Sequence, residues 1–264
     1  IELWPKWLEL LKEFNNQLNI VKPLIQLTTN EETFKKLEKF INETNNQDLK
    51  ILEKDSLLIE NINKAFQTKN LKGIISFNDG RINAASLLKT LDTYLKNKKV
   101  DFLEDEIIKI SKSNKQWIAT SRTKKEIKSD VIILCNSLNT IDLIDNFSHN
   151  IKLKPVLGQA IEVRINHREV DLLSLPKHFN INGKNIIPIS KNKLIIGSTD
   201  EYNTKPEKYI FEKLTNFIDK KPTWLVKGNI TRQWSGIRSR PDGEPSPIMK
   251  KIGDGLIICT GFYK

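Results

Sequence analysis

The sequence contains few of the residues that build metal centres and nucleophilic active sites. Its 264 residues include three histidines and two cysteines. His149, His167 and His178 lie in polar or loop contexts without the spacing of metal ligands, and no Cys-x-x-Cys or His-x-x-x-His pair occurs, so we expect no metal site. Cys135 and Cys259 each end an aliphatic run, which predicts small buried residues without a disulfide and fits the reducing cytoplasm.

Long apolar runs and the common nucleotide-binding and hydrolase motifs are also missing. No stretch approaches the roughly 20 apolar residues of a membrane-spanning helix, and no secretory signal heads the chain. Neither a Gly-x-Ser-x-Gly elbow nor a Walker loop is present. The segment GDGLII at 253–258 is similar to a dinucleotide motif, but Ile258 replaces the third glycine and a strand follows where a helix N-terminus is needed.

Acidic residues are fewer than basic ones, which gives the chain a formal net charge of +11. The excess is mostly lysine scattered along the whole sequence, whereas a surface that follows nucleic-acid phosphates should gather its basic residues on one face. We therefore expect no nucleic-acid partner, although a basic nucleic-acid-binding protein stays open as an alternative on charge alone. The hydrophobic content of 38% is enough for one large core or two smaller ones and predicts a globular protein.

Hydrophobic periodicity predicts a mixed order of helices and strands. Helical spacing of apolar residues occurs in the segments 4–14, 29–43, 60–68, 84–97 and 206–219. Extended segments are expected at 23–28, 73–77, 155–165, 185–189, 193–199, 226–234 and 255–261, with four short strands between 99 and 135. The last of these four, DVIILC, is apolar on both faces, which predicts a sheet that is covered on both sides.

Arginine is rare in this lysine-rich chain, but it is concentrated in the segment RQWSGIRSRPDGEPSPI at 232–248. Three of the seven arginines, Arg232, Arg238 and Arg240, lie within nine residues there. Arginine is preferred over lysine where a planar donor must hold a carboxylate with two hydrogen bonds. The segment alone is equally compatible with surface ion pairs in a turn.

The residues around these arginines resemble the C-terminal signature of the D-amino acid oxidase family of FAD-dependent oxidoreductases. The segment WSGIR at 234–238 is followed by PDGEP at 241–245 and then by a strand that ends in CTGFYK. Other segments match in the family's order, namely DGRINAASLLKTLDTYLKNKKVDFLEDEIIKI, DVIILCNS, and PVLGQAIEV followed by IIPISKNKLIIGSTDE. The resemblance extends from about residue 20 to the end and points to the glycine oxidase branch.

The resemblance implies a mixed α+β fold, in which a partial FAD-binding domain is interleaved with an antiparallel-sheet substrate domain. Residues 1–72 and 151–232 would form the substrate-binding domain, and residues 73–150 and 233–264 would form the partial FAD-binding domain. The implied activity is oxidation of a small amino acid or N-methyl amine, of the glycine, D-amino acid or sarcosine type, by hydride transfer to flavin. The partner is then a small amino-acid or amine substrate, and the number of subunits stays open, a homo-oligomer included.

The resemblance also assigns site residues. Arg238 corresponds to the arginine that clamps the substrate carboxylate and orients the substrate, which makes it the candidate catalytic residue. Lys264 lies where the family has a second carboxylate-binding residue, and Asn185 lies where the glycine oxidase branch carries an active-site tyrosine. Because the interval from Arg238 to the Asp-Gly turn is one residue shorter than usual, Arg240 is the runner-up for the clamp.

The implied FAD contacts come from three places in the chain. Backbone contact with the adenine end falls at Ile107, and Ser137 stands where a glycine normally lets the backbone approach the cofactor. The flavin-side loop comprises Gly261, Phe262, Tyr263 and Lys264. The family's opening strand, Gly-x-Gly-x-x-Gly and helix are not found in the sequence, so the chain resembles a member that starts late. A truncated or degenerate family member without catalysis is therefore the alternative function.

Overall fold

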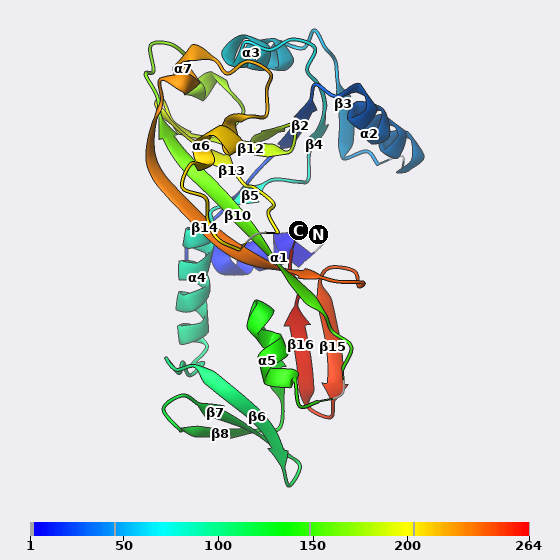
Figure 1. The fold of residues 1–264 in the computed structure, drawn as a ribbon, viewed down its shortest axis with the longest axis vertical. Helices are drawn as coiled ribbons and strands as arrows, with labels where there is room; N and C mark the ends of the chain where they lie inside the picture. Colours follow the sequence, from blue (N-terminus) through cyan, green and yellow to red (C-terminus); the bar gives the residue numbers. More distant parts are fainter. Residues whose placement is uncertain (1–2, 45, 148, 203, 264) are drawn as a thin grey trace. The chain divides into compact units, whose positions relative to one another are not determined.

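A computed structural model describes residues 3–44, 46–147, 149–202 and 204–263 (Figure 1). The chain forms two compact units. Unit 1 comprises Ile1–Asp101, Gln159–Thr199 and Glu207–Trp234, and unit 2 comprises Phe102–Gly158, Asp200–Pro206 and Ser235–Lys264. Two of the five boundaries between them fall inside long strands, β10 (Leu153–Arg164) and β14 (Asn229–Pro241). Within the described ranges, no helix has the length and apolar character needed to cross a membrane.

Unit 1 is built on an eight-stranded sheet with the strand order β14-β10-β13-β12-β11-β2-β4-β3. Its other strands are β2 (Leu24–Thr28), β3 (Leu49–Leu52), β4 (Lys72–Ser76), β11 (Phe179–Ile181), β12 (Lys184–Ser190) and β13 (Lys193–Gly197). Strands β2 and β11 pair in parallel, whereas other neighbours, such as β10 with β13 and β2 with β4, are antiparallel. The sheet is therefore dominated by antiparallel pairing.

Six helices of unit 1 accompany this sheet in the described ranges. They are α1 (Leu3–Lys12), α2 (Glu31–Thr44), α3 (Leu57–Phe66), α4 (Ala84–Asn97), α6 (Ile210–Thr215) and α7 (Thr223–Val226), with a short 3-10 turn at Leu172–Ser174 and a two-stranded pair of β1 (Ile20–Val21) with β5 (Arg81–Ile82). Helix α4 begins where the Asn83 side chain accepts a hydrogen bond from the backbone N–H of Ser86 at 3.0 Å, which satisfies an otherwise unpaired donor of the first turn.

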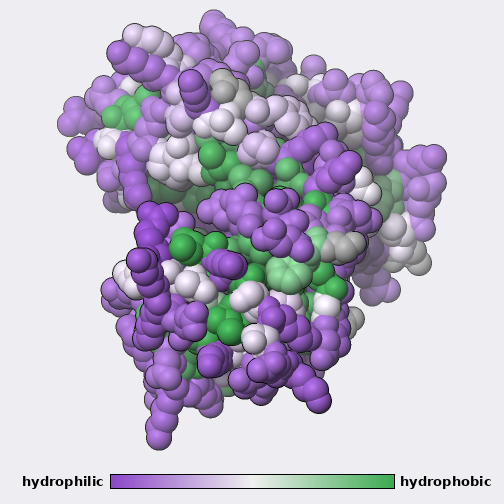
Figure 2. Space-filling view, turned by 60° about the horizontal axis from the view of Figure 1, so that its bottom comes forward, coloured by the Kyte–Doolittle hydropathy of each residue, from purple (hydrophilic) through white to green (hydrophobic). Residues whose placement is uncertain are grey.

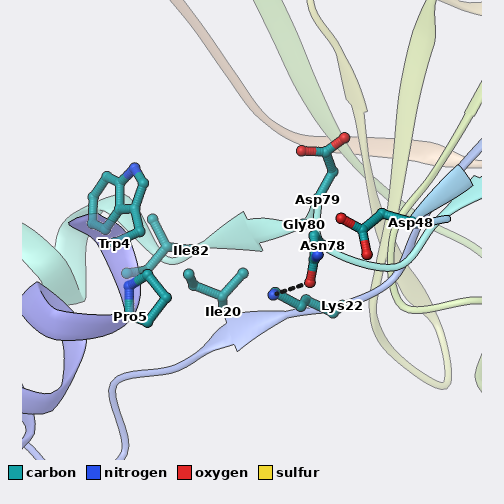
Figure 3. A pocket seen from close by; sticks show the side chains of 9 residues that line it. All are labelled: Trp4, Pro5, Ile20, Lys22, Asp48, Asn78, Asp79, Gly80 and Ile82. Atoms are coloured by element: carbon teal, nitrogen blue, oxygen red, sulfur yellow. Dashed lines mark hydrogen bonds between the residues drawn. The ribbon is translucent and has the colours of Figure 1, made fainter. Parts of the chain in front are cut away.

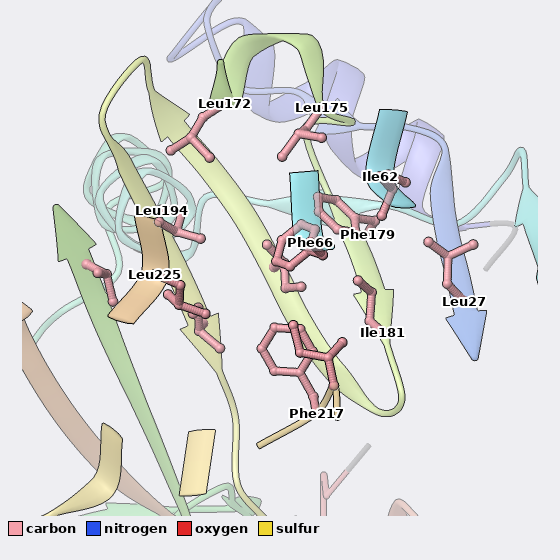
Figure 4. Close-up of a cluster of buried hydrophobic side chains, with 14 of the residues drawn as sticks. Leu27, Ile62, Phe66, Leu172, Leu175, Phe179, Ile181, Leu194, Phe217 and Leu225 are labelled. Atoms are coloured by element: carbon pink, nitrogen blue, oxygen red, sulfur yellow. The ribbon is translucent and has the colours of Figure 1, made fainter. Parts of the chain in front are cut away.

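The hydrophobic core of unit 1 lies where α3, α6 and α7 pack against the sheet (Figure 4). Phe66 of α3 is fully buried, and its ring meets those of Phe179, Phe217 and Trp224 edge to face, with centroids 5.3 to 5.9 Å apart. The indole N–H of Trp224 donates to the backbone oxygen of Ala65 at 2.6 Å, so the polar atom of this large side chain is satisfied inside the core.

Unit 2 contains two small sheets and a short helix. A meander is formed by β6 (Ile107–Ser113), β7 (Gln116–Ser121) and β8 (Glu126–Ser129). A second sheet has the order β15-β16-β9, with β9 (Ile132–Leu134) parallel to β16 (Leu256–Thr260) and β15 (Ile248–Gly253) antiparallel to it. A 3-10 turn, Ser137–Asn139, leads into α5 (Thr140–Ile144).

Trp117 connects the meander of unit 2 to its second sheet. Its side chain is 2% exposed and belongs to the same core as Leu134, Leu256 and Ile258. Its indole N–H donates to the backbone oxygen of Asp254, in the turn between β15 and β16, at 2.8 Å. Unit 2 therefore has a core of its own.

The structure confirms the mixed α+β class and corrects several local predictions. The helix predicted at 206–219 is only six residues long. The expectation of a sheet covered on both faces at DVIILC is wrong, because Ile133 is 58% exposed. Cys135 is also exposed and Cys259 only partly buried, so these free thiols are not the core residues we expected. The physical reason is that, in the described part of the chain, β9 pairs on one side only, and one of its faces lacks a cover.

Hydrophilic side chains cover most of the molecular face drawn in Figure 2, with hydrophobic groups between them. The exposed large hydrophobic residues are distributed over both units, for example Trp7 and Leu88 in unit 1 and Ile108 and Phe262 in unit 2. Single exposed apolar side chains of this kind are normal on protein surfaces.

Candidate functional site

The guanidinium of Arg238 lies against the body of unit 2, and its side chain is 29% exposed. Arg238 is on the unit 2 part of β14, and one of its terminal nitrogens, Nη2, donates to Oδ1 of Asp200 at 2.7 Å. The guanidinium carbon also lies 5.4 Å from the centroid of the Tyr263 ring, a cation–π distance. The side chain therefore faces the C-terminal segment instead of extending into bulk water.

Gly158 of β10 makes room for this guanidinium. A Cβ atom at position 158 would lie 2.7 Å from Nη2 of Arg238 and 3.1 Å from its guanidinium carbon. Only a residue without a side chain lets the arginine cross so close to the β10 backbone and reach Asp200. Leu157, the preceding residue, forms an antiparallel bridge with Glu201, which holds the Asp200 segment beside β10.

Arg240 shares the aromatic surroundings of Arg238. Residues two apart on a strand point to the same face. The guanidinium of Arg240 lies 5.5 Å from the centroid of Tyr263 and 5.9 Å from that of Tyr202, and Nη1 donates to the Tyr202 hydroxyl. The ring of Tyr263 therefore contacts both guanidinium groups of this strand.

Burial raises the pKa of the Tyr263 phenol above its ordinary value, and the charge of the Asp200 carboxylate and a hydrogen bond to it act in the same direction. The positive charges of Arg238 and Arg240 oppose this rise. Tyr263 is consequently a neutral phenol at neutral pH and keeps its hydroxyl proton for donation.

A hollow of about 890 Å³ lies next to Arg240 in unit 2. Its lining includes Lys154, Tyr202, Arg240, Asp242, Glu244 and Tyr263. Lys154 pairs with Asp242 at 2.9 Å, and Lys250 pairs with Glu244 at 2.6 Å. The two acidic groups of the lining are thus already neutralised by lysines.

Ser137 and Gly261 lie together at the carboxyl ends of two parallel strands. Ser137 follows β9 with φ +58°, and Gly261 follows β16 with φ +70°. The Thr260 hydroxyl donates to the backbone oxygen of Ser137 at 2.9 Å, and the hydroxyls of Ser137 and Ser239 are 3.1 Å apart. Ligands of open α/β sheets bind outside this edge of the strands. The left-handed φ at Ser137 also explains why glycine would suit the position.

Ile107, at the start of β6, lines a second hollow of unit 2, of about 750 Å³. Ile133, Cys135 and Asn136 line the same hollow. The structure therefore brings Ile107 to a cavity that reaches the residue before Ser137. Phe262 is 61% exposed, and Lys264 lies outside the described residues.

Asn185 belongs to β12 in unit 1, so the structure describes it separately from Arg238. Its side-chain oxygen accepts from Nδ2 of Asn180 at 3.3 Å and lies 3.2 Å from Nε2 of His178. Burial lowers the pKa of His178, the hydrogen bond to Asn185 opposes this, and the charge of Arg81 adds to the lowering. His178 is therefore held as the neutral imidazole.

Unit 1 has a hollow of its own, of about 520 Å³, between the start of α1 and the turn before β5 (Figure 3). Trp4 and Ile82 lie at one end of it, and Asp48 and Asp79 at the other. Lys22 donates to the side-chain oxygen of Asn78 at 3.3 Å. None of the predicted site residues lines this hollow.

Sequence reasoning missed three residues that surround the arginines, namely Gly158, Asp200 and Tyr202. Asp200 and Tyr202 follow β13, and the sheet order places β10, with Gly158, between β13 and β14. Local spacing carries no signal for this contact, because 38 residues separate Asp200 from Arg238. A prediction of strand order would have been needed to find it.

The whole chain, residues 1–264, matches the model of the DAO family, described as FAD dependent oxidoreductase. No curated protein sequence matches the chain. Among solved structures, the fold is similar to glycine oxidase from Geobacillus kaustophilus, with a TM-score of 0.79 and 19% identity over 99% of this chain and 71% of that chain. It is also similar to glycine oxidase from Bacillus cereus ATCC 14579 (TM-score 0.80, 17% identity, 99% and 73%) and to iminodiacetate oxidase from Chelativorans sp. BNC1 (TM-score 0.79, 13% identity, 99% and 73%).

The description of this family names FAD, and some residues of this chain are suited to contact such a cofactor. Ser137 and Gly261 offer left-handed backbone at a parallel strand edge, where a cofactor can approach the main chain. A Cβ at Gly261 would lie 2.7 Å from Cγ of Pro241, so this close packing requires glycine. No glycine-rich loop followed by a helix, the usual holder of a pyrophosphate, occurs in the sequence.

Proposed function

Because the chain belongs to the family of FAD dependent oxidoreductases, as its sequence predicted, we propose that it oxidises a small amino acid or N-methyl amine at the carbon next to nitrogen. The observation that carries this proposal is the guanidinium of Arg238, which already holds one carboxylate, that of Asp200, at 2.7 Å. A substrate carboxylate can take the place of Asp200 with the same hydrogen-bond geometry.

Arg238 supplies binding and orientation. A charge-assisted hydrogen bond contributes roughly 1.5 to 3 kcal/mol, and a planar guanidinium that is fixed against the Tyr263 ring also limits the directions in which a bound substrate can lie. The C–H bond that must be broken then points in one direction. Gly158 is part of this arrangement, because a side chain at this position would collide with the guanidinium of Arg238.

The tyrosines and the strand ends complete the proposed site. Neutral Tyr263 retains a proton with which it can hydrogen-bond an anionic group, and the Tyr202 hydroxyl lies next to Arg240, from which it accepts a hydrogen bond. Ser137, Gly261 and Ile107 are the residues that would hold FAD, which when bound supplies the hydride acceptor. The oxidised substrate is an imine, which water hydrolyses to an oxo acid and ammonia when the substrate is a primary amino acid, or to an oxo acid and methylamine when the nitrogen carries a methyl group. Because the acceptor is the cofactor, the chain needs no nucleophilic triad.

The test compares two single variants of the full-length, FAD-loaded protein. Arg238→Ala should raise the KM for an oxidised amino acid on the order of ten- to a hundredfold, because a charged hydrogen bond is lost. Lys152→Ala, a change at an exposed lysine of the same unit, should leave KM within about twofold. Glycine, sarcosine and D-alanine are suitable substrates for the assay. Equal effects of the two variants would remove Arg238 from the site.

A second candidate function is a family member that keeps the fold without catalysis. It is favoured by the serine at position 137, where a side chain stands at the cofactor edge. Such a protein would hold flavin weakly. A full-length preparation that is colourless, and that stays so after incubation with FAD and desalting, would support this candidate, whereas bound flavin in the purified protein would dismiss it.

We also propose that the fold divides by ligand, with 1–72 and 151–232 facing the substrate and 73–150 and 233–264 facing FAD. The positions of Ile107, Ser137 and Gly261 in unit 2 support the second part. Hydrogen exchange with and without FAD would test the division, because protection confined to 1–72 would contradict it.

We also propose a cytoplasmic location, which fractionation of the source cells would check.

A further inference from the structure

Arg240 pairs with tyrosines instead of with an acidic residue in the described part of the chain. In the ranges that the structure describes, no Asp or Glu oxygen lies within 4.0 Å of its guanidinium, whereas Arg238 pairs with Asp200 at 2.7 Å. Its guanidinium contacts the two tyrosine rings and the Tyr202 hydroxyl. A guanidinium held by aromatic rings keeps its hydrogen-bond donors directed outward and available for an anion.

The surroundings of Arg240 are suited to a second anionic group of one ligand. Arg238 and Arg240 point to the same face of β14 and lie about 7 Å apart along the strand. Tyr263 contacts both, so the two positive groups share one wall. Because both side chains start from neighbouring positions on one face and contact the same ring, one small ligand with two carboxylates can engage both guanidinium groups.

The hollow beside Arg240 also gives such a group room. Its volume is about 890 Å³, and its acidic residues Asp242 and Glu244 are paired with Lys154 and Lys250. An incoming carboxylate would therefore meet a positive group next to neutralised acids. Arg240 also has the planar fork that a carboxylate engages with two hydrogen bonds.

We propose that Arg240 binds a second carboxylate of the substrate, so that the preferred substrates are amines that carry two carboxylates. This inference rests on the proposed function, in which Arg238 takes the first carboxylate. Arg240 is then the residue that determines substrate class, and Tyr202 positions it through the contact with its hydroxyl.

The experiment compares two amines that differ by one carboxylate, iminodiacetate and sarcosine, on the full-length protein. The wild-type KM should be lower for iminodiacetate. Arg240→Gln should raise the iminodiacetate KM roughly tenfold or more and change the sarcosine KM by less than about twofold. Arg240→Lys, which keeps the charge without the fork, should fall between the two. Arg232→Gln, at an exposed arginine of unit 1, is the matched control and should change neither constant.

A binding measurement separates this inference from the proposed function. Iminodiacetate should raise the melting temperature of the wild type more than sarcosine does, and Arg240→Gln should abolish the difference. If neither amine is oxidised but iminodiacetate still raises the melting temperature of the wild type more than sarcosine does, the proposed oxidation is wrong and the carboxylate subsite stands. If Arg240→Gln changes both KM values equally, or if iminodiacetate still stabilises the Arg240→Gln variant more than sarcosine does, the subsite is refuted. Should Arg240→Gln not fold, Tyr202→Phe provides the same comparison, with a smaller loss of iminodiacetate preference as the supporting result.

Discussion

His178 is the side chain whose protonation should couple most directly to folding. It is 8% exposed, and burial lowers its pKa below the ordinary value. Below about pH 6.5, the unfolded chain therefore binds a proton that the folded chain does not bind. The contribution of His178 to stability is thus present above this pH and decreases as the pH falls towards the lowered pKa of the folded state.

We expect the melting temperature to fall between about pH 7.5 and about pH 5.5, and part of this fall to disappear in His178→Gln. His167→Gln, at an exposed histidine of the same unit, is the control and should retain the full pH dependence. Thermal unfolding monitored at both pH values measures the difference. An unchanged pH dependence in His178→Gln would show that other groups are responsible.

The identity of the candidate clamp could be predicted from single residues, but its environment could not. Arg238 stood out because arginine is rare in the chain and because the WSGIR segment matches the family's signature. Asp200 and Tyr202 gave no such signal, because they reach the arginines only through the order of the strands around β10. The roles that the resemblance gave to Arg238 and to the other site residues, namely Ile107, Ser137, Asn185, Gly261, Phe262, Tyr263 and Lys264, stay predictions.

At the scale of elements, the Arg238 side chain of β14 lies across β10 at Gly158, where the lack of a side chain leaves room for the guanidinium. Because the atom nearest to a new Cβ at position 158 is the end of a flexible side chain, the strand can tolerate alanine while the guanidinium moves aside. Gly158→Ala should therefore raise the KM for substrate severalfold and lower the melting temperature little. Gly236→Ala, where a Cβ meets nothing within 4 Å, is the matched control. A KM unchanged in both variants would contradict the role of Gly158.

The element predictions did not succeed by length alone, because the four short strands expected between 99 and 135 are present as β6 to β9, whereas the helix expected at 206–219 is only six residues long. The helix predicted at 84–97 is α4 with the same bounds, and the strand predicted at 23–28 is β2. Strands β3 and β11, of four and three residues, were missed because such short segments carry too little periodicity to be recognised alone. The apolar character of β9 indicated burial on both faces, but only one face packs against the rest of unit 2.

At the scale of the whole molecule, the net charge is +11, and some of the basic residues form ion pairs with acidic neighbours. Lys36 pairs with Glu32, Lys193 with Glu162 and Lys213 with Glu207, so acidic groups interrupt the basic surface. We expect no retardation of a labelled DNA duplex by the full-length protein at low salt, because the basic residues are scattered along the sequence and several of them pair with acidic groups. A complex whose affinity falls steeply with added salt would contradict this prediction and revive the alternative of a nucleic-acid-binding protein.

The contact between Arg238 and Asp200 competes with the binding of a substrate carboxylate to Arg238. Each substrate must replace an internal carboxylate whose effective concentration is fixed by the fold, so the measured affinity equals the intrinsic affinity multiplied by the fraction of molecules in which Asp200 has withdrawn. This competition lowers the affinity of every ligand by the same factor. The loop after β13 would therefore set how strongly substrates bind, and the pocket that receives the substrate would set which of them is preferred.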